Sequence, residues 1–322
     1  MKHSRRAILI GASIALLARR TGLAQEAARV YRLGFLVQPP KQNFNVMFDE
    51  LRLRGFSEGD NLLVQPNGFG VPVDQLDDVV VELVASQPHV IYAGGAAAGR
   101  AAHRATTTIP VVVTADDMLR ERLVASLARP GGNLTGISIL ATELDGKRLE
   151  LLTEIVRGAH RVAALIDPGT TPPEQIDGLV AMALSKGIDL AVYRAAAPAE
   201  IGPAIAAAQA AGAQAIDVLA SALFNANRET IIARIAKAKL PAVYQWPEYG
   251  QEGALLSYGP SIEGFYRQAA RLIVKIFGGA KPGDLPIEQP SRIALVVNLQ
   301  SARALGLTIP PSILARADEV IE

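Results

Sequence analysis

Short runs rich in β-branched residues alternate with segments of helical periodicity along most of the chain, and no other feature limits the possible folds as strongly. The β-branched runs lie at residues 30–37, 90–92, 110–114, 161–166, 188–193, 215–219 and 293–297. Between them apolar side chains recur at helical spacing, as they do within residues 76–84, 231–236 and 265–276. This repetition of strand, helix and strand predicts an α/β fold whose parallel sheets are covered by helices on both faces.

The alternation occurs twice, which predicts two lobes. A first series runs from residue 30 to about 138, and a second begins at Arg161 after a helix-like stretch at 143–155. So many strands fit two sheets better than one. We expect an N-terminal lobe of residues 30–138 plus about 249–286. The C-terminal lobe would hold about 139–248 plus 287–322, and the segments that cross between the lobes would form a hinge.

The first 24 residues have the pattern of a secretory signal peptide. Lys2, Arg5 and Arg6 precede an apolar run at residues 7–18, and Gly22 and Ala24 are small residues of the kind that a signal peptidase requires. The apolar run is shorter than the roughly 20 residues that span a bilayer, which disfavours a permanent transmembrane helix. We therefore expect export to the periplasm by the Sec route, although the pair of arginines leaves the twin-arginine route open.

Composition excludes several classes of function. The chain has 32 Lys and Arg against 31 Asp and Glu, so it lacks the basic excess typical of a nucleic-acid-binding protein. It contains no cysteine, and its four histidines show no spacing typical of a metal site. No P-loop, dinucleotide-binding or G-x-S-x-G motif occurs, so we expect no enzyme activity, no metal and no cofactor.

A loop of small residues, GGAAAG at 94–99, follows the second of these predicted strands. Such a loop lets a ligand approach the backbone N–H groups at the start of the next helix, where a carboxylate or phosphate binds well. Gly95, Ala96 and Ala97 are therefore candidate ligand-binding residues. A tight strand-to-helix turn that needs small residues only for packing explains the loop equally well.

Two carboxylates follow the next predicted strand. Asp116 and Asp117 lie at its carboxyl end, where open α/β folds bind ligands. A carboxylate in this position can pair with a ligand ammonium. Because Asp is also a preferred helix N-cap, we expect Asp117 to cap a helix at residues 118–128, which makes Asp116 the better ligand candidate.

Aromatic residues make up 5% of the chain, so their positions are informative. Phe224, Trp246 and Tyr258 lie near predicted strand ends or crossing segments, where they can stack on a flat ligand or pack in the core. We favour the pocket for Trp246 because its surroundings in the sequence are polar and irregular. Glu248, close behind it, and Gln38, after the first predicted strand, complete the candidate ligand-binding residues.

Several motifs together resemble those of a known family. They are ASLARPGGNLTG at 125–136, GKRLELL at 146–152, LPAVY at 240–244, LSYGP at 256–260, LPIEQP at 285–290, and a tail from ALGLTIPP to ADEVIE at 304–322. They span most of the chain in natural order. By these motifs the chain resembles the ABC transporter substrate-binding proteins of the family that includes the tryptophan-binding TrpX-like proteins.

The resemblance implies a type I periplasmic-binding-protein fold, with two Rossmann-like lobes, three crossovers and a ligand between the lobes. It implies a small-molecule ligand, an amino acid or a related compound and aromatic in some members. A membrane permease and a cytoplasmic ATPase would be the partners, and we expect the binding protein to be a monomer. The chain departs from the family pattern at residues 117–122, where small residues are usual, and in the glycine-rich loop, which lacks the usual Ser or Thr.

These expectations share one mechanism, in which a hinge closes two lobes around a ligand that leaves chemically unchanged. Two alternatives remain open. A ligand-sensing receptor subunit would have the same lobes. A Rossmann-like enzyme would need a nucleophile or an acid–base pair with an orienting partner, and the sequence does not provide one.

Overall fold

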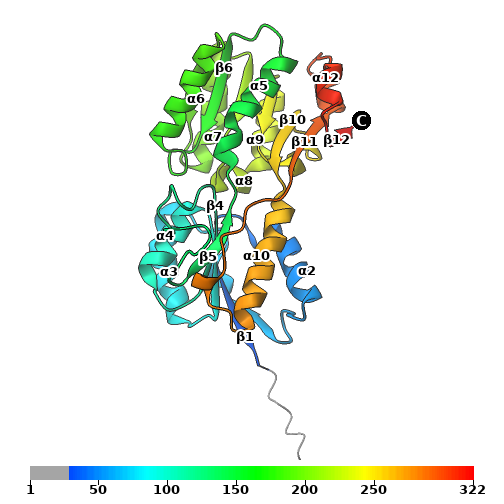
Figure 1. Ribbon diagram of the computed structural model, residues 1–322. Helices are drawn as coiled ribbons and strands as arrows, with labels where there is room; N and C mark the ends of the chain where they lie inside the picture. Colours follow the sequence, from blue (N-terminus) through cyan, green and yellow to red (C-terminus); the bar gives the residue numbers. More distant parts are fainter. Residues whose placement is uncertain (1–28) are drawn as a thin grey trace, which may run out of the picture.

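Two sheets, each covered by helices on both faces, form two lobes that lie one above the other (Figure 1). The computed structural model describes residues 29–322. The predicted signal peptide, residues 1–24, lies outside the described residues. Within residues 29–322, every helix is too short or too polar to cross a membrane.

The first lobe is built on a five-stranded sheet in which every neighbouring pair is parallel. In spatial order its strands are β2 (Leu62–Val64), β1 (Tyr31–Leu36), β3 (Val90–Gly94), β4 (Val111–Ala115) and β5 (Leu134–Ser138). The helices of this lobe are α2 (Asn45–Leu53), α3 (Leu76–Ala85), α4 (Ala96–Ala105) and α10 (Ile262–Phe277). Helices α2 and α10 pack together on one face, and α3 and α4 cover the other (Figure 1).

The second lobe is built on a seven-stranded sheet with one antiparallel pair, β10 with β11. In spatial order its strands are β12 (Glu319–Ile321), β11 (Ile293–Asn298), β10 (Leu256–Pro260), β9 (Ala242–Tyr244), β8 (Ala215–Val218), β6 (Arg161–Ile166) and β7 (Asp189–Arg194). Its helices are α5 (Asp145–Ile155), α6 (Pro173–Ser185), α7 (Pro198–Ala210), α8 (Ala222–Ala226), α9 (Arg228–Lys237), α11 (Leu299–Ala304) and α12 (Pro311–Leu314). Helices α5 and α6 lie on one face of the sheet, and α7 and α9 on the other.

The central strands are buried on both faces, as their apolar sequences require. All five residues of β4 are buried, as are all four of β8. The stripes of apolar residues predicted for α3, α9 and α10 face the sheets, and α10 alone buries eight residues. One hydrophobic cluster runs without interruption from Phe35 in the first lobe to Ile231 in the second. The two lobes are therefore in direct apolar contact.

Three segments connect the lobes. The first leaves β5 and enters α5, the second leaves β10 and enters α10, and the third leads from Glu288 to β11. The first and third lie side by side, because Ser138 N donates a hydrogen bond to Glu288 O at 2.9 Å and Glu288 N donates to Gly136 O at 2.9 Å. A movement of one lobe relative to the other must therefore bend these segments together.

The strands and helices predicted from periodicity are present, but the structure differs from two other expectations. All seven β-branched runs form strands. Strand β10, however, lies between β9 and β11 of the second sheet, so the chain returns to the first lobe at α10 and not at about residue 249. The helix predicted at 118–128 is replaced by turns, in which Asp117 Oδ1 accepts hydrogen bonds from Leu119 N at 3.0 Å and Arg120 N at 3.1 Å.

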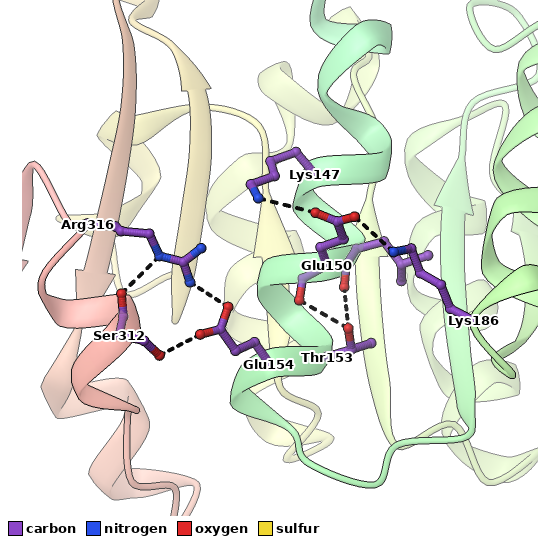
Figure 2. Close-up of polar contacts among 8 residues, drawn as sticks. Lys147, Glu150, Thr153, Glu154, Lys186, Ser312 and Arg316 are labelled. Carbon is purple, nitrogen blue, oxygen red and sulfur yellow. Dashed lines mark hydrogen bonds and ion pairs between the residues drawn. The ribbon is translucent and has the colours of Figure 1, made fainter.

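Ion pairs on the outer face of α5 connect it to its neighbours (Figure 2). Glu150 accepts hydrogen bonds from Lys147 at 3.2 Å and from Lys186, at the end of α6, at 2.9 Å. One turn further along, Glu154 accepts from Ser312 Oγ at 2.6 Å and pairs with Arg316, which holds α12 against α5. Each exposed pair contributes little stability by itself, so these contacts mainly orient the C-terminal segment.

We predict that Gly259→Ala destabilises the second lobe. A Cβ at this position of β10 would lie 1.9 Å from the carbonyl oxygen of Gln245, the residue before Trp246, so the backbone must shift. The expected loss is about 1–3 kcal/mol in the free energy of unfolding, measured by chemical denaturation. Gly178→Ala is the control, because nothing lies within 4 Å of its Cβ position in α6, and it should gain about 0.5–1 kcal/mol. Equal unfolding midpoints for the two variants would contradict the prediction.

Candidate functional site

A cavity of about 100 Å³ lies between the two lobes. Its first-lobe wall comes from the ends of β3 and β4, the start of α4, and α10. Its second-lobe wall comes from the loops after β6, β8 and β9 and from the first turn of α6. The strands of both sheets thus end at this cavity, which is where open α/β sheets bind ligands.

One side of the cavity is aromatic. Its five aromatic residues are Phe44, Tyr92, Trp246, Phe265 and Tyr266. The rings contact one another, with centroids 4.9 Å apart for Phe44 and Tyr266 and 5.5 Å apart for Trp246 and Phe265. The second of these contacts joins the lobes, because Trp246 follows β9 and Phe265 belongs to α10. This surface can hold a flat apolar group between the lobes.

The indole nitrogen of Trp246 is buried and donates no hydrogen bond to any of the described residues. Trp246 itself is 5% exposed. Tyr92 differs, because its hydroxyl donates to Thr114 Oγ1 at 3.0 Å. The Trp246 N–H in the aromatic wall can therefore donate a hydrogen bond to a ligand.

One end of the cavity is polar. Asp116, directly after β4, is half-buried, and its carboxylate accepts hydrogen bonds from Thr142 N at 3.1 and 3.3 Å. Thr142 belongs to the first connecting segment, so Asp116 connects the end of β4 to the hinge. Thr142 Oγ1 is buried and makes no hydrogen bond within residues 29–322. Acceptor oxygens are therefore concentrated at this end of the cavity.

The glycine-rich loop reaches the cavity. Gly95 precedes α4 with a φ of 98°, a conformation that glycine adopts without strain, and no side chain caps the helix. Gly95 and Ala96 line the main cavity. Ala97 and Gln38 line a smaller space of about 20 Å³ beside it. The first backbone N–H groups of α4 are thus available at the edge of the cleft.

Comparison with known proteins places these features in a family. Residues 42–321 match the family described as ABC transporter substrate binding protein. This chain belongs to that family. The match covers more than half of the sequence, and it makes the protein a substrate-binding protein and not a member of an enzyme family.

Several known proteins are similar to this substrate-binding protein in sequence or in fold. A tyrosine-binding protein of Clostridioides difficile is 24% identical over 259 residues, which cover 79% of this chain and 73% of the relative. The structure of a conserved domain protein from Vibrio cholerae is 26% identical, with a TM-score of 0.80 over 91% of this chain and 99% of that one. An ABC domain from Streptococcus pneumonia in complex with L-Trp is 23% identical, with a TM-score of 0.77 over 91% and 100% of the two chains.

Four of the predicted ligand-binding residues line neither the main cavity of the substrate-binding protein nor the smaller space beside it. Asp117 holds the turn described above. Phe224 is 1% exposed and packs in the apolar core. Tyr258 points to the α5 face of the second sheet. Glu248 lines a neighbouring polar groove, where its Oε1 accepts from Ser261 Oγ at 2.6 Å and burial raises the pKa of its carboxyl group. Position near a strand end does not decide which way a side chain points.

The sequence did not identify several residues that line the cavity. Tyr92 lies within a predicted strand, and Phe265 was assigned to the core stripe of α10. Gln175 and Asn225 line the cavity from the second lobe, and no motif marks either of them. The small loop after β3, Asp116 and Trp246 were the local signals near this group. These side chains line the same cavity only because the two lobes pack against each other.

Behind the polar end of the cavity lies a group of buried charges. Asp145 and Arg148, in the first turns of α5, form an ion pair, and Arg148 is 0% exposed. Arg148 also donates to Tyr258 O at 3.3 Å. Beneath α5, on β8, Asp217 is 0% exposed, and neither of its carboxyl oxygens accepts a hydrogen bond from any described residue. Burial raises the pKa of Asp217 to about 7, although the charge of Arg148 lowers it.

We predict that Asp217→Asn changes the pH dependence of stability. The pKa of Asp217 in the folded protein, about 7, exceeds the ordinary value of 3.8, so this carboxyl group destabilises the fold progressively as the pH rises from 3.8 to about 7. The variant cannot ionise at this position. Its free energy of unfolding, relative to wild type, should therefore rise by up to about 4 kcal/mol from acidic to mildly alkaline pH, at about 1.4 kcal/mol for each pKa unit. Urea denaturation across this pH range tests it, and a difference that stays constant would contradict it.

Proposed function

We propose that this substrate-binding protein captures an aromatic amino acid, or a close relative of one, between its lobes and delivers it to the permease of an ABC importer. The observation that carries the proposal is the composition of the inter-lobe cavity. An aromatic wall, a carboxylate and an uncapped helix N-terminus surround one space. An aromatic amino acid carries the three matching groups, which are a flat ring, an ammonium and a carboxylate.

In the proposed complex each group has its own partners. The ligand ring lies between Trp246 and the aromatic side chains of the first lobe. The ammonium pairs with Asp116, and the carboxylate accepts hydrogen bonds from the backbone N–H groups of Ala96 and Ala97. Gln38 lies beside this helix start and completes the carboxylate end. The relatives named for tyrosine and bound to L-Trp support a ligand of this class.

Capture is proposed to occur by closure of the lobes. The structure has a TM-score of 0.77 with the L-Trp complex, against 0.60 with the ligand-free, open structure of a substrate binding protein from Clostridium difficile at a similar identity of 20%. This difference supports a closed arrangement, as does the contact of Trp246 with Phe265 across the cleft. A ligand that contacts both walls stabilises the closed form over the open one.

The cellular setting follows from the family and the N-terminus. We propose that residues 1–24 are removed as a signal peptide and that the mature protein works in the periplasm as a monomer. Its partners are a membrane permease and, through it, a cytoplasmic ATPase. The ligand is released unchanged, without a metal or cofactor and without catalysis.

Trp246 provides a direct test, because it is the only tryptophan of the chain. We expect its fluorescence to change on titration with L-tyrosine or L-phenylalanine, measured with excitation that these ligands do not absorb. Calorimetry checks the affinity independently, and mass spectrometry of the recovered ligand checks that it is unchanged. Unaltered fluorescence and no heat with any aromatic amino acid would contradict the proposed ligand class, and a modified ligand would contradict its role in transport.

We predict that Asp116→Asn weakens binding of L-tyrosine roughly tenfold to hundredfold, because the ion pair with the ammonium is replaced by a hydrogen bond to a neutral amide oxygen. Binding of 3-(4-hydroxyphenyl)propionate, which lacks the ammonium, should change little. Asp117→Asn is the matched control, since the neighbouring carboxylate holds a turn outside the cavity. Equal effects of Asp116→Asn on both compounds would show that Asp116 only supports the hinge.

A further inference from the structure

We infer that Gln175 provides a second acceptor for the ligand ammonium, and that buried Asp145 is the positioning residue that turns the Gln175 carbonyl towards the cavity. This inference rests on the proposed function and deepens it, because it adds a contact from the second lobe to the one that Asp116 makes from the first. The ammonium would then be held from both sides of the cleft.

The position of Gln175 supports the first part. It lies in the first turn of α6, lines the inter-lobe cavity and is partly exposed there. Its side-chain nitrogen Nε2 donates a hydrogen bond to Asp145 Oδ2 at 2.6 Å. Its carbonyl oxygen Oε1 makes no hydrogen bond within the described part of the chain and is not sealed off from solvent. The amide therefore uses its donor behind the wall and keeps its acceptor for the cavity.

Asp145 decides this orientation. An ionised carboxylate only accepts hydrogen bonds, so it can bind the NH₂ end of Gln175 and not the carbonyl end. The other oxygen of Asp145 accepts from Arg148, which is itself buried and bonded to Tyr258 O. Asp145 is 3% exposed and cannot turn towards solvent. The Asp145–Arg148 pair thus holds the Gln175 amide in one of its two orientations.

The same end of the cavity contains Asp116. Asp116 accepts from Thr142 N, and Thr142 lies three residues before Asp145 in the first connecting segment. Asp116, Thr142 and Gln175 all line the cavity, and their oxygens are acceptors. An ammonium, which has three donors and no acceptor, matches this set better than a hydroxyl group does.

The test uses the full mature protein in mildly alkaline buffer, because alkaline pH favours the ionised form of Asp145 against the burial that raises its pKa. The affinities of L-tyrosine and 3-(4-hydroxyphenyl)propionate are measured by calorimetry. Gln175→Leu should weaken L-tyrosine roughly tenfold to hundredfold and leave the propionate unchanged. Asp145→Asn should cause a similar selective loss, because the introduced NH₂ can donate to Oε1 and reverse the amide.

A rescue separates positioning from a general structural role. In the double variant Asp145→Asn with Gln175→Glu, the introduced asparagine donates to one oxygen of the introduced glutamate and leaves the other facing the cavity. We expect affinity for L-tyrosine to return to within a few-fold of wild type, even where the melting temperature does not. Glu154→Gln, on the exposed face of the same helix, is the control and should leave both affinities unchanged.

The outcomes distinguish the two proposals. A wild-type protein that binds neither compound would contradict the proposed ligand class. A wild-type protein that binds L-tyrosine, with an affinity that Gln175→Leu does not alter, would overturn the role of Gln175. If Gln175→Leu weakens binding but the double variant stays as weak as Asp145→Asn, the positioning role of Asp145 is overturned.

Discussion

The site depends on one constraint, which is that the carboxyl ends of the parallel strands in the two sheets face each other. In each sheet the parallel strands next to the cleft have their carboxyl ends there. The loops after β3, β4, β6, β8 and β9 therefore meet in one cavity. In a parallel sheet all carboxyl ends share an edge, and helix N-termini follow directly behind them. Loop residues, backbone N–H groups and short polar side chains are concentrated there as a consequence. The core of each lobe needs none of them, which leaves them available for a ligand.

Contact across the cleft is both apolar and polar. The aromatic wall joins Trp246 of the second lobe to Phe265 of the first, and one hydrophobic cluster continues through both lobes. Opening the lobes exposes part of this surface to water, which costs free energy in proportion to the apolar area exposed. The connecting segments at Ser138 and Glu288 are hydrogen-bonded together, so they bend as a unit. A movement that separates the lobes would therefore break apolar contacts and bend the paired connecting segments.

Burying charged groups beneath the polar end of the cavity costs free energy, and the packing of the lobe does not require it. The guanidinium of Arg148 faces two carboxyl groups, Asp145 and Asp217, inside the second lobe. A buried ion pair rarely adds stability compared with apolar residues of similar size. Burial raises the pKa of both carboxyl groups, which reflects the same cost. The hydrogen bond from Gln175 to Asp145 links this cluster to the cavity. In our proposal the buried charges orient Gln175, which is a residue of the cavity wall.

The sequence by itself determined the fold class, the seven strands recognised as β-branched runs, the apolar faces of α3, α9 and α10, and the small loop before α4. These features depend on local periodicity and on the conformational preferences of single residues, so a short segment of sequence is sufficient to predict them. Tertiary structure alone decided that β10 joins the second sheet, that residues 118–128 form turns, and that Phe265 and Gln175 face the cleft while Phe224 and Tyr258 do not. A strand can pair with either of two sheets and an aromatic side chain can serve core or cavity equally well, so these outcomes depend on which surfaces meet when the two lobes pack.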